Sequence, residues 1–187
     1  MLTLAAVLGL GVAVLLVRGP VEKGIREITL PLRHEDIIRQ QAHLKGLNPA
    51  LVAAVIYQES KFEDRTSSAG ALGLMQLLPD TANFIARKSG GTRFTTKDLS
   101  TPQVNIAYGT WYLRYLTQRY GGNKMLAVAA YNAGEHNVDT WVTRAGGQHG
   151  FDPQRDIPFP ETRGYVQSVL EHEKLYRQHY GRELGLR

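Results

Sequence analysis

One glutamate at the end of an apolar helix has the setting of an acid catalyst. Asn48 is a favoured helix N-cap residue and Pro49 a favoured first helical residue, so the sequence predicts a helix from residue 49 onward. Helical spacing puts Glu59 on the same face as the apolar residues Val52, Val55 and Ile56. Lost solvation and the negative potential of the helix C-terminus both raise the pKa of such a carboxyl group. An acid that stays protonated near neutral pH is what cleavage of a glycosidic bond requires.

The same glutamate has a simpler interpretation as a solvated residue on a helix surface. Lys61 and Arg65 follow it closely and could pair with it there. Most glutamates in folded proteins are solvated, so the helix pattern alone leaves both interpretations open.

Three later segments accompany the Glu59-Ser60 pair. They are Gly-Leu-Met-Gln at 73–76, Ala-Tyr-Asn-Ala-Gly at 130–134 and Ile-Pro-Phe-Pro-Glu-Thr-Arg-Gly-Tyr-Val at 157–166. The four together resemble the catalytic domain of soluble lytic transglycosylases, which share the goose-type lysozyme fold and cut bacterial peptidoglycan. The resemblance covers roughly residues 33–180. One such segment would be a weak signal, whereas four in order at sensible spacing are specific.

The resemblance implies a reaction for the chain. Glu59 matches the family's single catalytic acid/base, which protonates the oxygen of the β-1,4 bond between N-acetylmuramic acid and N-acetylglucosamine. The carboxylate then takes the proton of the muramyl C6 hydroxyl as that oxygen attacks C1, which gives a 1,6-anhydromuramyl product without water. The substrate's acetamido group can stabilise C1 meanwhile, unlike in the scheme with two carboxylates.

The resemblance also implies substrate-binding residues, each with a structural alternative. Tyr131 matches a tyrosine near the catalytic acid, although an aromatic residue in this apolar setting is more often core. Asn132 could bind a sugar hydroxyl or end a helix, and Gln76 could bind glycan or stand at a helix N-terminus. Met75 fits a cleft wall or the core, and Glu161 fits the cleft or a first helical turn. Ser60 and Gly73 complete the set, since Gly73 permits close backbone approach.

Two function classes remain as alternatives. A goose-type muramidase would hydrolyse the same bond with a second carboxylate; Glu63 and Asp64 are the acids closest in sequence to Glu59, but we expect both to face solvent. A catalytically inactive peptidoglycan-binding module is the other alternative. No cofactor is expected: the chain has no cysteine, and its six histidines show no ligand spacing, so a metal site is not predicted.

Composition and charge are those of a folded globular protein. The 187 residues are 43% hydrophobic and 21% charged, and the net charge is +5. That charge favours an anionic environment such as a polyanionic wall, or reflects only a solvated surface. Nucleic acid is not expected as a partner, because no binding motif or basic cluster is present. The partners predicted are peptidoglycan glycan strands and a membrane, and the chain is expected to be monomeric.

The chain is predicted to have three parts. Residues 1–18 are expected to be a membrane anchor or signal segment, since 2–17 form an uncharged apolar run. A linker over 19–32 and a catalytic domain over 33–187 follow. An uncleaved anchor is favoured over a cleaved signal, and a buried core helix is the alternative. These features predict an extracytoplasmic protein of the bacterial cell envelope, membrane-anchored or secreted.

The fold class predicted is all-α and lysozyme-like, with an N-terminal hydrophobic helix, because strand signals are nearly absent. We expect a loop over 61–74 and irregular structure over 143–160. Helices are expected at 34–45, 49–60, 79–88, 103–120, 125–133 and 161–180.

Overall fold

The computed structural model describes residues 24–91 and 93–186, which belong to two compact units divided between Leu32 and Arg33. In the first unit, residues 24–29 are helical. The apolar run at 2–17, predicted as an anchor or signal, lies outside the described residues. Across the two described ranges, no helix has both the length and the apolar character needed to cross a membrane.

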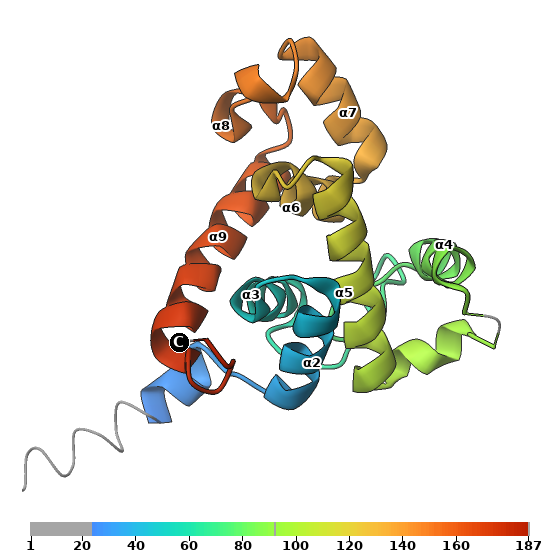
Figure 1. Ribbon diagram of the computed structural model, residues 1–187, viewed down its shortest axis with the longest axis vertical. Helices are drawn as coiled ribbons and strands as arrows, with labels where there is room; N and C mark the ends of the chain where they lie inside the picture. Colours follow the sequence, from blue (N-terminus) through green and yellow to red (C-terminus); the bar gives the residue numbers. More distant parts are fainter. Residues whose placement is uncertain (1–23, 92, 187) are drawn as a thin grey trace, which may run out of the picture. The chain divides into compact units, whose positions relative to one another are not determined.

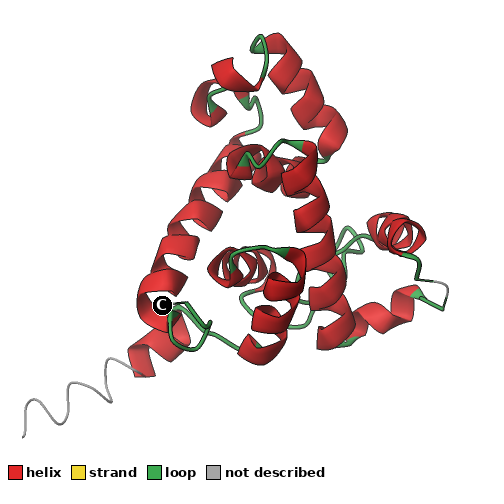
Figure 2. Ribbon diagram, viewed as in Figure 1, coloured by secondary structure: helices red, strands yellow, loops and turns green. Residues whose placement is uncertain are grey.

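The second unit, Arg33–Arg187, consists of helices joined by turns and one long loop (Figure 1). In the described part of the chain there is no strand (Figure 2), only the isolated bridges Thr66–Leu72 and Leu72–Leu77 within the loop. The prediction of an all-α domain is therefore confirmed. Its elements are α2 (Glu35–Lys45), α3 (Pro49–Ser60), α4 (Pro79–Ser89), η1 (Thr96–Ser100), α5 (Pro102–Arg119), α6 (Lys124–Ala133), α7 (Glu135–Arg144), η2 (Gln148–Gly150), α8 (Pro153–Asp156) and α9 (Pro160–Tyr180).

Helix α3 is the core helix of this unit. Its start is fixed as predicted, because the Asn48 side chain accepts a hydrogen bond of 2.9 Å from the backbone N–H of Ala50 and Pro49 is the first helical residue. Every side chain from Ala50 to Ile56 is buried. A helix that is apolar on all sides is stable only inside a core. Helices α9, α6, α5 and α2 contact one another in succession, and both α9 and α2 pack on α3 (Figure 1).

The helix predictions hold to within about two residues, but three features differ. A helical turn (η1) that was not predicted precedes α5. Helix α7 was not predicted, and it buries only Val138 and Trp141. The segment 143–160, expected to be irregular, contains the short helices η2 and α8.

The loop between α3 and α4 is held in place by one buried side chain of α5. The Asn105 side chain accepts from the backbone N–H of Met75 at 2.8 Å and donates to the carbonyls of Leu72 at 2.9 Å and Leu99 at 3.0 Å. Gly73, at φ +74°, lies so close that a Cβ there would be 2.1 Å from Asn105 Nδ2. A glycine is therefore required at this position, and the loop backbone has a defined path.

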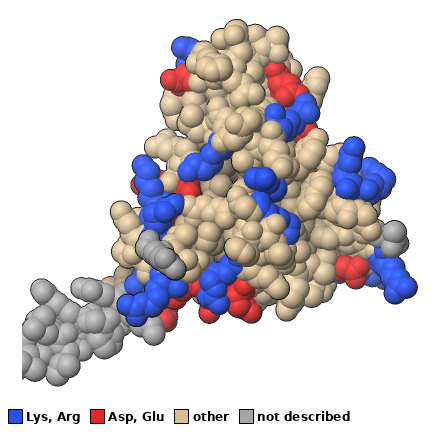
Figure 3. All heavy atoms as spheres, in the orientation of Figure 1, with Lys and Arg blue, Asp and Glu red and all other residues tan. Residues whose placement is uncertain are grey.

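Basic side chains are spread over the face of the molecule seen in Figure 3. Lys and Arg lie at several separate places, with Asp and Glu between some of them, and form no continuous strip.

Candidate active site

Glu59 lies in the last turn of α3, half-buried, with its carboxyl group held by a tyrosine from α9. The Tyr165 hydroxyl donates a hydrogen bond of 2.6 Å to Glu59 Oε1, and the Tyr165 side chain is itself buried. Burial raises the pKa of Glu59 to about 7, against the smaller lowering effects of the Tyr165 hydrogen bond and the positive charge of Arg65. The carboxyl group can therefore hold a proton near neutral pH.

A cleft of about 550 Å³ opens beside this carboxyl group. Its walls come from the end of α3, the loop before α4, the start of α4, the middle of α5 and the end of α6. Among the described residues, Glu59 is the only acid that lines it. The residues that line it include Glu59, Arg65, Gln76, Leu78, Thr81, Tyr112, Tyr131, Asn132 and Gly134.

The loop wall of the cleft is tied to the backbone of Glu59. Arg65 donates from Nη2 to the Glu59 carbonyl oxygen at 2.7 Å, and not to the carboxyl group. The Gln76 amide in turn donates to the carbonyls of Arg65 at 2.9 Å and Gly73 at 2.7 Å. Gln76 has a left-handed backbone (φ 47°), which is uncommon outside glycine and asparagine. These bonds fix the position of Gln76 in the cleft wall.

Tyr131 also lines the cleft, but its hydroxyl bonds to the loop and not to the acid. It donates 3.0 Å to the carbonyl oxygen of Met75. Burial, followed by the negative charge of Glu59, raises the pKa of Tyr131 well above its usual value, so its hydroxyl stays protonated. The ring of Tyr112 lies 5.6 Å from that of Tyr131, centroid to centroid.

Two of the other predicted binding residues, Asn132 and Glu161, are exposed, but only Asn132 lines the cleft. Asn132 is exposed in the cleft wall, and its Oδ1 accepts from the Thr162 hydroxyl at 2.8 Å, which leaves its amide N–H groups facing outward as potential donors. Glu161 is exposed in the first turn of α9 and does not line the cleft, although it lies one helical turn before Tyr165.

Three predicted binding residues do not present their side chains to the cleft. Ser60 is buried, and its hydroxyl lies 2.7 Å from the Leu74 carbonyl oxygen, to which it donates. The Met75 side chain is buried against Gly109, where an added Cβ would lie 2.4 Å from its sulfur. Gly73 packs on Asn105. The contacts of these three residues lie in the protein interior. The residues therefore support the loop that carries Gln76 and do not face the cleft.

Sequence reasoning missed the residue that contacts the acid directly. Tyr165 belongs to the segment at 157–166, but only Glu161 was chosen from it. Tyr165, Val166 and Val169 recur at helical spacing on α9 and are all buried, so the tyrosine reads as a core residue in the sequence. Its role becomes visible only when α9 packs on α3. Tyr112, which also lines the cleft, was likewise not chosen from the sequence as a binding residue.

Glu63 and Asp64, the acids considered for a second carboxylate, are exposed in the loop, as expected, and do not line the cleft. Over residues 24–91 and 93–186, no group of three or more His, Asp or Glu side chains is arranged to hold a metal ion.

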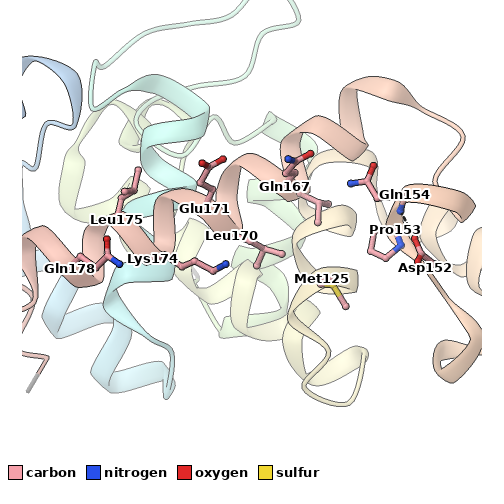
Figure 4. Close-up of a pocket in the computed structure, with 11 residues that line it drawn as sticks. Met125, Asp152, Pro153, Gln154, Gln167, Leu170, Glu171, Lys174, Leu175 and Gln178 are labelled. Carbon is pink, nitrogen blue, oxygen red and sulfur yellow. Dashed lines mark hydrogen bonds between the residues drawn. The ribbon is translucent and has the colours of Figure 1, made fainter.

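A second hollow, of about 660 Å³, lies along α9 and is larger than the cleft. Figure 4 shows Leu170, Lys174 and Gln178 on α9 facing it, with Met125 at the start of α6 and Pro153 at the start of α8. It contains neither Glu59 nor any tyrosine that contacts Glu59. Size alone would favour this hollow, but the acid with the raised pKa places the chemistry in the smaller cleft.

Two family models and several known proteins match this chain. Residues 36–152 match the family described as transglycosylase SLT domain, and residues 156–184 match the soluble lytic transglycosylase helical domain. The chain is 35% identical to the soluble lytic murein transglycosylase of Salmonella typhimurium over 86% of its own length and 25% of that relative. It is 28% identical to the membrane-bound lytic murein transglycosylase C of Haemophilus influenzae over 75% of this chain and 46% of the relative. The chain thus spans about a quarter of the length of the soluble relatives.

Solved structures show the same fold. The 70 kDa soluble lytic transglycosylase of Escherichia coli superposes with a TM-score of 0.77 at 34% identity, over 86% of this chain and 27% of that one. An inactive glutamate-to-glutamine mutant of the lytic transglycosylase Slt from Pseudomonas aeruginosa gives a TM-score of 0.75 at 36% identity, over 83% of this chain and 26% of that one. The predicted lysozyme-like all-α fold is confirmed by these neighbours. Because the first family match covers more than half of the chain, this protein belongs to the transglycosylase SLT domain family.

Proposed function

We propose that this protein is a peptidoglycan lytic transglycosylase that cleaves the β-1,4 bond between N-acetylmuramic acid and N-acetylglucosamine. The single observation that carries the proposal is one half-buried carboxyl group, with its pKa raised to about 7, in a cleft of a domain of this family. An acid with that pKa is protonated in part of the population at neutral pH, as proton donation to a leaving group requires. The peptidoglycan relatives and the inactive glutamate-to-glutamine neighbour support the same assignment.

In the proposed reaction, one proton moves out and back. Glu59 donates its proton to the glycosidic oxygen as the bond from that oxygen to the muramyl C1 breaks, and the substrate's acetamido oxygen stabilises C1. The Glu59 carboxylate then accepts the proton of the C6 hydroxyl as the C6 oxygen bonds to C1. The products are a 1,6-anhydromuramyl end and a free N-acetylglucosamine end, and Glu59 is protonated again. Tyr165, which donates to Oε1, orients the carboxyl group through both steps.

The cleft favours this route over hydrolysis with two carboxylates. That mechanism needs a second carboxyl group within about 5 to 9.5 Å of the first. Within the described part of the chain, no second acid lines the cleft, and Glu63 and Asp64 point to solvent. A route in which the substrate supplies both its acetamido group and its own hydroxyl needs only the one acid that is present.

Gln76, Tyr131 and Asn132 are proposed to contact the glycan directly, because each lines the cleft. Glu161 is proposed to contact it one helical turn beyond Tyr165. Ser60, Gly73 and Met75 are proposed to act on binding indirectly, by holding the loop that carries Gln76.

The decisive experiment is mass spectrometry of purified murein digested with this chain. The expected products carry 1,6-anhydromuramyl ends and are lighter by one water than hydrolysis products. Reducing muramyl ends would instead establish a muramidase. Binding to murein with no new ends would establish a binding module.

Glu59→Gln keeps the size of the side chain and removes the carboxyl proton, so it is expected to abolish product formation. An active Glu59→Gln protein would contradict the assignment of the acid.

The proposed substrate places the protein in the bacterial cell envelope, and the membrane-bound relative of Haemophilus influenzae supports attachment to a membrane. We propose that residues 2–17 provide it. Fractionation of cells expressing the full chain should find it with membranes, and a chain that starts after residue 18 should be released from them.

A further inference from the structure

Aromatic side chains continue beyond the cleft along α4 and α5. Leu78, the N-cap residue of α4, and Thr81 in its first turn line the cleft, and Phe84 follows at the next position with the same spacing. On α5, Tyr112 lines the cleft, and Tyr115 follows one turn later. Two walls of the cleft therefore extend in the same direction into a set of aromatic rings.

These rings form one continuous group, which we call the aromatic shelf: Phe84, Trp111 and Tyr115. The Trp111 and Tyr115 rings are almost parallel (5°), with centroids 5.7 Å apart. Phe84 meets each of them edge-on, at 6.5 Å from Trp111 and 5.4 Å from Tyr115. Tyr115 joins the shelf to the cleft, because its ring lies 6.1 Å from that of Tyr112 at an angle of 12°.

The shelf is held rigidly yet remains partly open to solvent. All three residues are half-buried. Phe84 and Trp111 pack against the buried cluster Leu77, Ala82, Ile85 and Leu99. The Tyr115 hydroxyl donates 3.2 Å to Glu135 Oε2, and Arg119 holds the same carboxylate oxygen at 2.9 Å. Glu135 follows Gly134 of the cleft wall, so this bond also ties the shelf to the far wall of the cleft.

We propose that the aromatic shelf is a further glycan subsite, which stacks on a sugar ring of the same strand beyond the residues bound in the cleft. This inference rests on the proposed function, since it takes the ligand of the cleft to be a glycan. The pyranose rings of peptidoglycan carry C–H groups on their faces, and these groups are attracted to the negative face of an aromatic ring. A strand that leaves the cleft between α4 and α5 meets Trp111 and Phe84 next.

The shelf makes recognition depend on strand length. A fragment that fills only the cleft does not reach Trp111, whereas a longer strand gains the stacking contact. If one ring contact is about as strong as an aromatic pair, a longer strand should bind about two- to tenfold more tightly, which corresponds to about 0.4–1.4 kcal/mol.

Fluorescence can test contact with the shelf directly. The chain has two tryptophans, and Trp141 is buried in α7 against Phe159. In the full chain with Glu59→Gln and Trp141→Phe, the one tryptophan left is Trp111. We expect its emission to change, and its quenching by iodide to fall, on titration with peptide-free glycan strands fractionated by length. A chain with Glu59→Gln and Trp111→Phe, which keeps only the buried Trp141, is the matched control and should show neither change. An unaltered Trp111 signal under saturating long strands would overturn the proposal.

Kinetics give a second and independent test. Trp111→Leu, which keeps apolar packing but removes the ring, should raise KM for long strands about two- to tenfold and leave a tetrasaccharide substrate unaffected. Trp111→Phe, which keeps an aromatic ring, should keep KM for long strands close to the wild-type value.

Phe94→Ala is the control, since it removes another half-buried ring, which stacks on Tyr108 of α5 at 4.6 Å. It should affect the long and the short substrate equally. Equal effects of Trp111→Leu on short and long substrates would contradict a stacking role. If the wild-type chain bound glycan strands without cleaving them, the proposed function would be wrong. The fluorescence experiment would still test the subsite, because it measures binding and not cleavage.

Discussion

At the scale of single residues, the protonation of Glu59 links activity to stability. Its ordinary pKa is 4.5, and burial raises it to about 7 in the folded protein. Between these values, the folded chain keeps a proton that the unfolded chain has lost. The ionisation of Glu59 therefore lowers native stability by up to about 3 kcal/mol as pH rises from about 4.5 to about 7. Above about pH 7 this loss stays constant. The acid that the reaction needs thus destabilises the fold at alkaline pH.

Glu59→Gln should remove this pH dependence, because glutamine cannot ionise and can still accept the Tyr165 hydrogen bond. We expect the free energy of unfolding of the variant, relative to wild type, to rise by up to about 3 kcal/mol between pH 4.5 and pH 8. Urea denaturation of both proteins at the two pH values is the measurement. Packing changes from the substitution do not depend on pH. The change in unfolding free energy between the two pH values therefore excludes them for each protein. An equal difference at both pH values would show that the carboxyl group is not shielded.

Tyr165 provides a finer test of the same carboxyl group. Its hydrogen bond to Glu59 Oε1 favours the charged form and lowers the pKa of Glu59. Tyr165→Phe should therefore move the alkaline limb of the activity profile to higher pH, by up to about one unit. Tyr131→Phe is the matched control, because the Tyr131 hydroxyl bonds to Met75 and not to the acid, and its limb should stay in place. If the alkaline limb moved in Tyr131→Phe and not in Tyr165→Phe, the hydrogen bond to the Glu59 carboxyl group would belong to Tyr131.

At the scale of elements, one buried acid joins three helices around the site. Glu173 on α9 accepts from Lys124, the first residue of α6, at 2.5 Å and from Asn48, the N-cap of α3, at 3.2 Å. It is 6% exposed, so these partners compensate for the burial of its carboxylate. Because α3 carries Glu59 and α9 carries Tyr165, this contact helps to set the register between the acid and its hydrogen-bond donor.

Glu173→Gln should destabilise the domain by about 1.5–3 kcal/mol, because it removes the negative charge and replaces one of the two acceptor oxygens with an NH2 group, which cannot accept from Lys124 or Asn48. Thermal unfolding at neutral pH measures the loss. Glu171→Gln changes an exposed acid of the same helix and should shift stability by less than about 0.5 kcal/mol. If both substitutions had equal effects, Glu173 would have no special part in joining the helices.

The helices themselves could be predicted from the sequence, whereas their contacts could not. Asn48 with Pro49 and the glycine at 46 mark helix ends through local backbone chemistry, so those boundaries are readable. The position of Glu59 at the end of α3 follows from the same signals. The Tyr165 contact joins residues 106 positions apart and requires α9 to pack on α3, which no local pattern encodes. Ser60 and Met75 were assigned to substrate binding from the family resemblance, yet the Ser60 hydroxyl bonds to the Leu74 carbonyl and the Met75 side chain packs on Gly109, so both point inward.

At the scale of the whole molecule, the net charge is +5, and on the face seen in Figure 3 the Lys and Arg side chains lie at separate places and form no single strip. A net positive charge attracts a polyanion from a distance. Peptidoglycan carries carboxylates on its lactyl groups and peptide stems. The charge is therefore expected to raise the local concentration of the protein on the wall, while the cleft and the aromatic shelf select the glycan.

This separation of roles predicts a particular salt dependence. Raising ionic strength from about 0.01 M to about 1 M shortens the Debye length from about 30 Å to about 3 Å, which removes long-range attraction. Binding of the Glu59→Gln chain to intact murein, measured by sedimentation, should weaken several-fold over that range. Binding to soluble, uncharged N-acetylglucosamine oligomers should stay nearly constant, because stacking and neutral hydrogen bonds hold them. Equal salt dependence for the neutral oligomers would mean that charge acts within the cleft itself, and then Arg65, the basic side chain in its wall, becomes the residue to substitute.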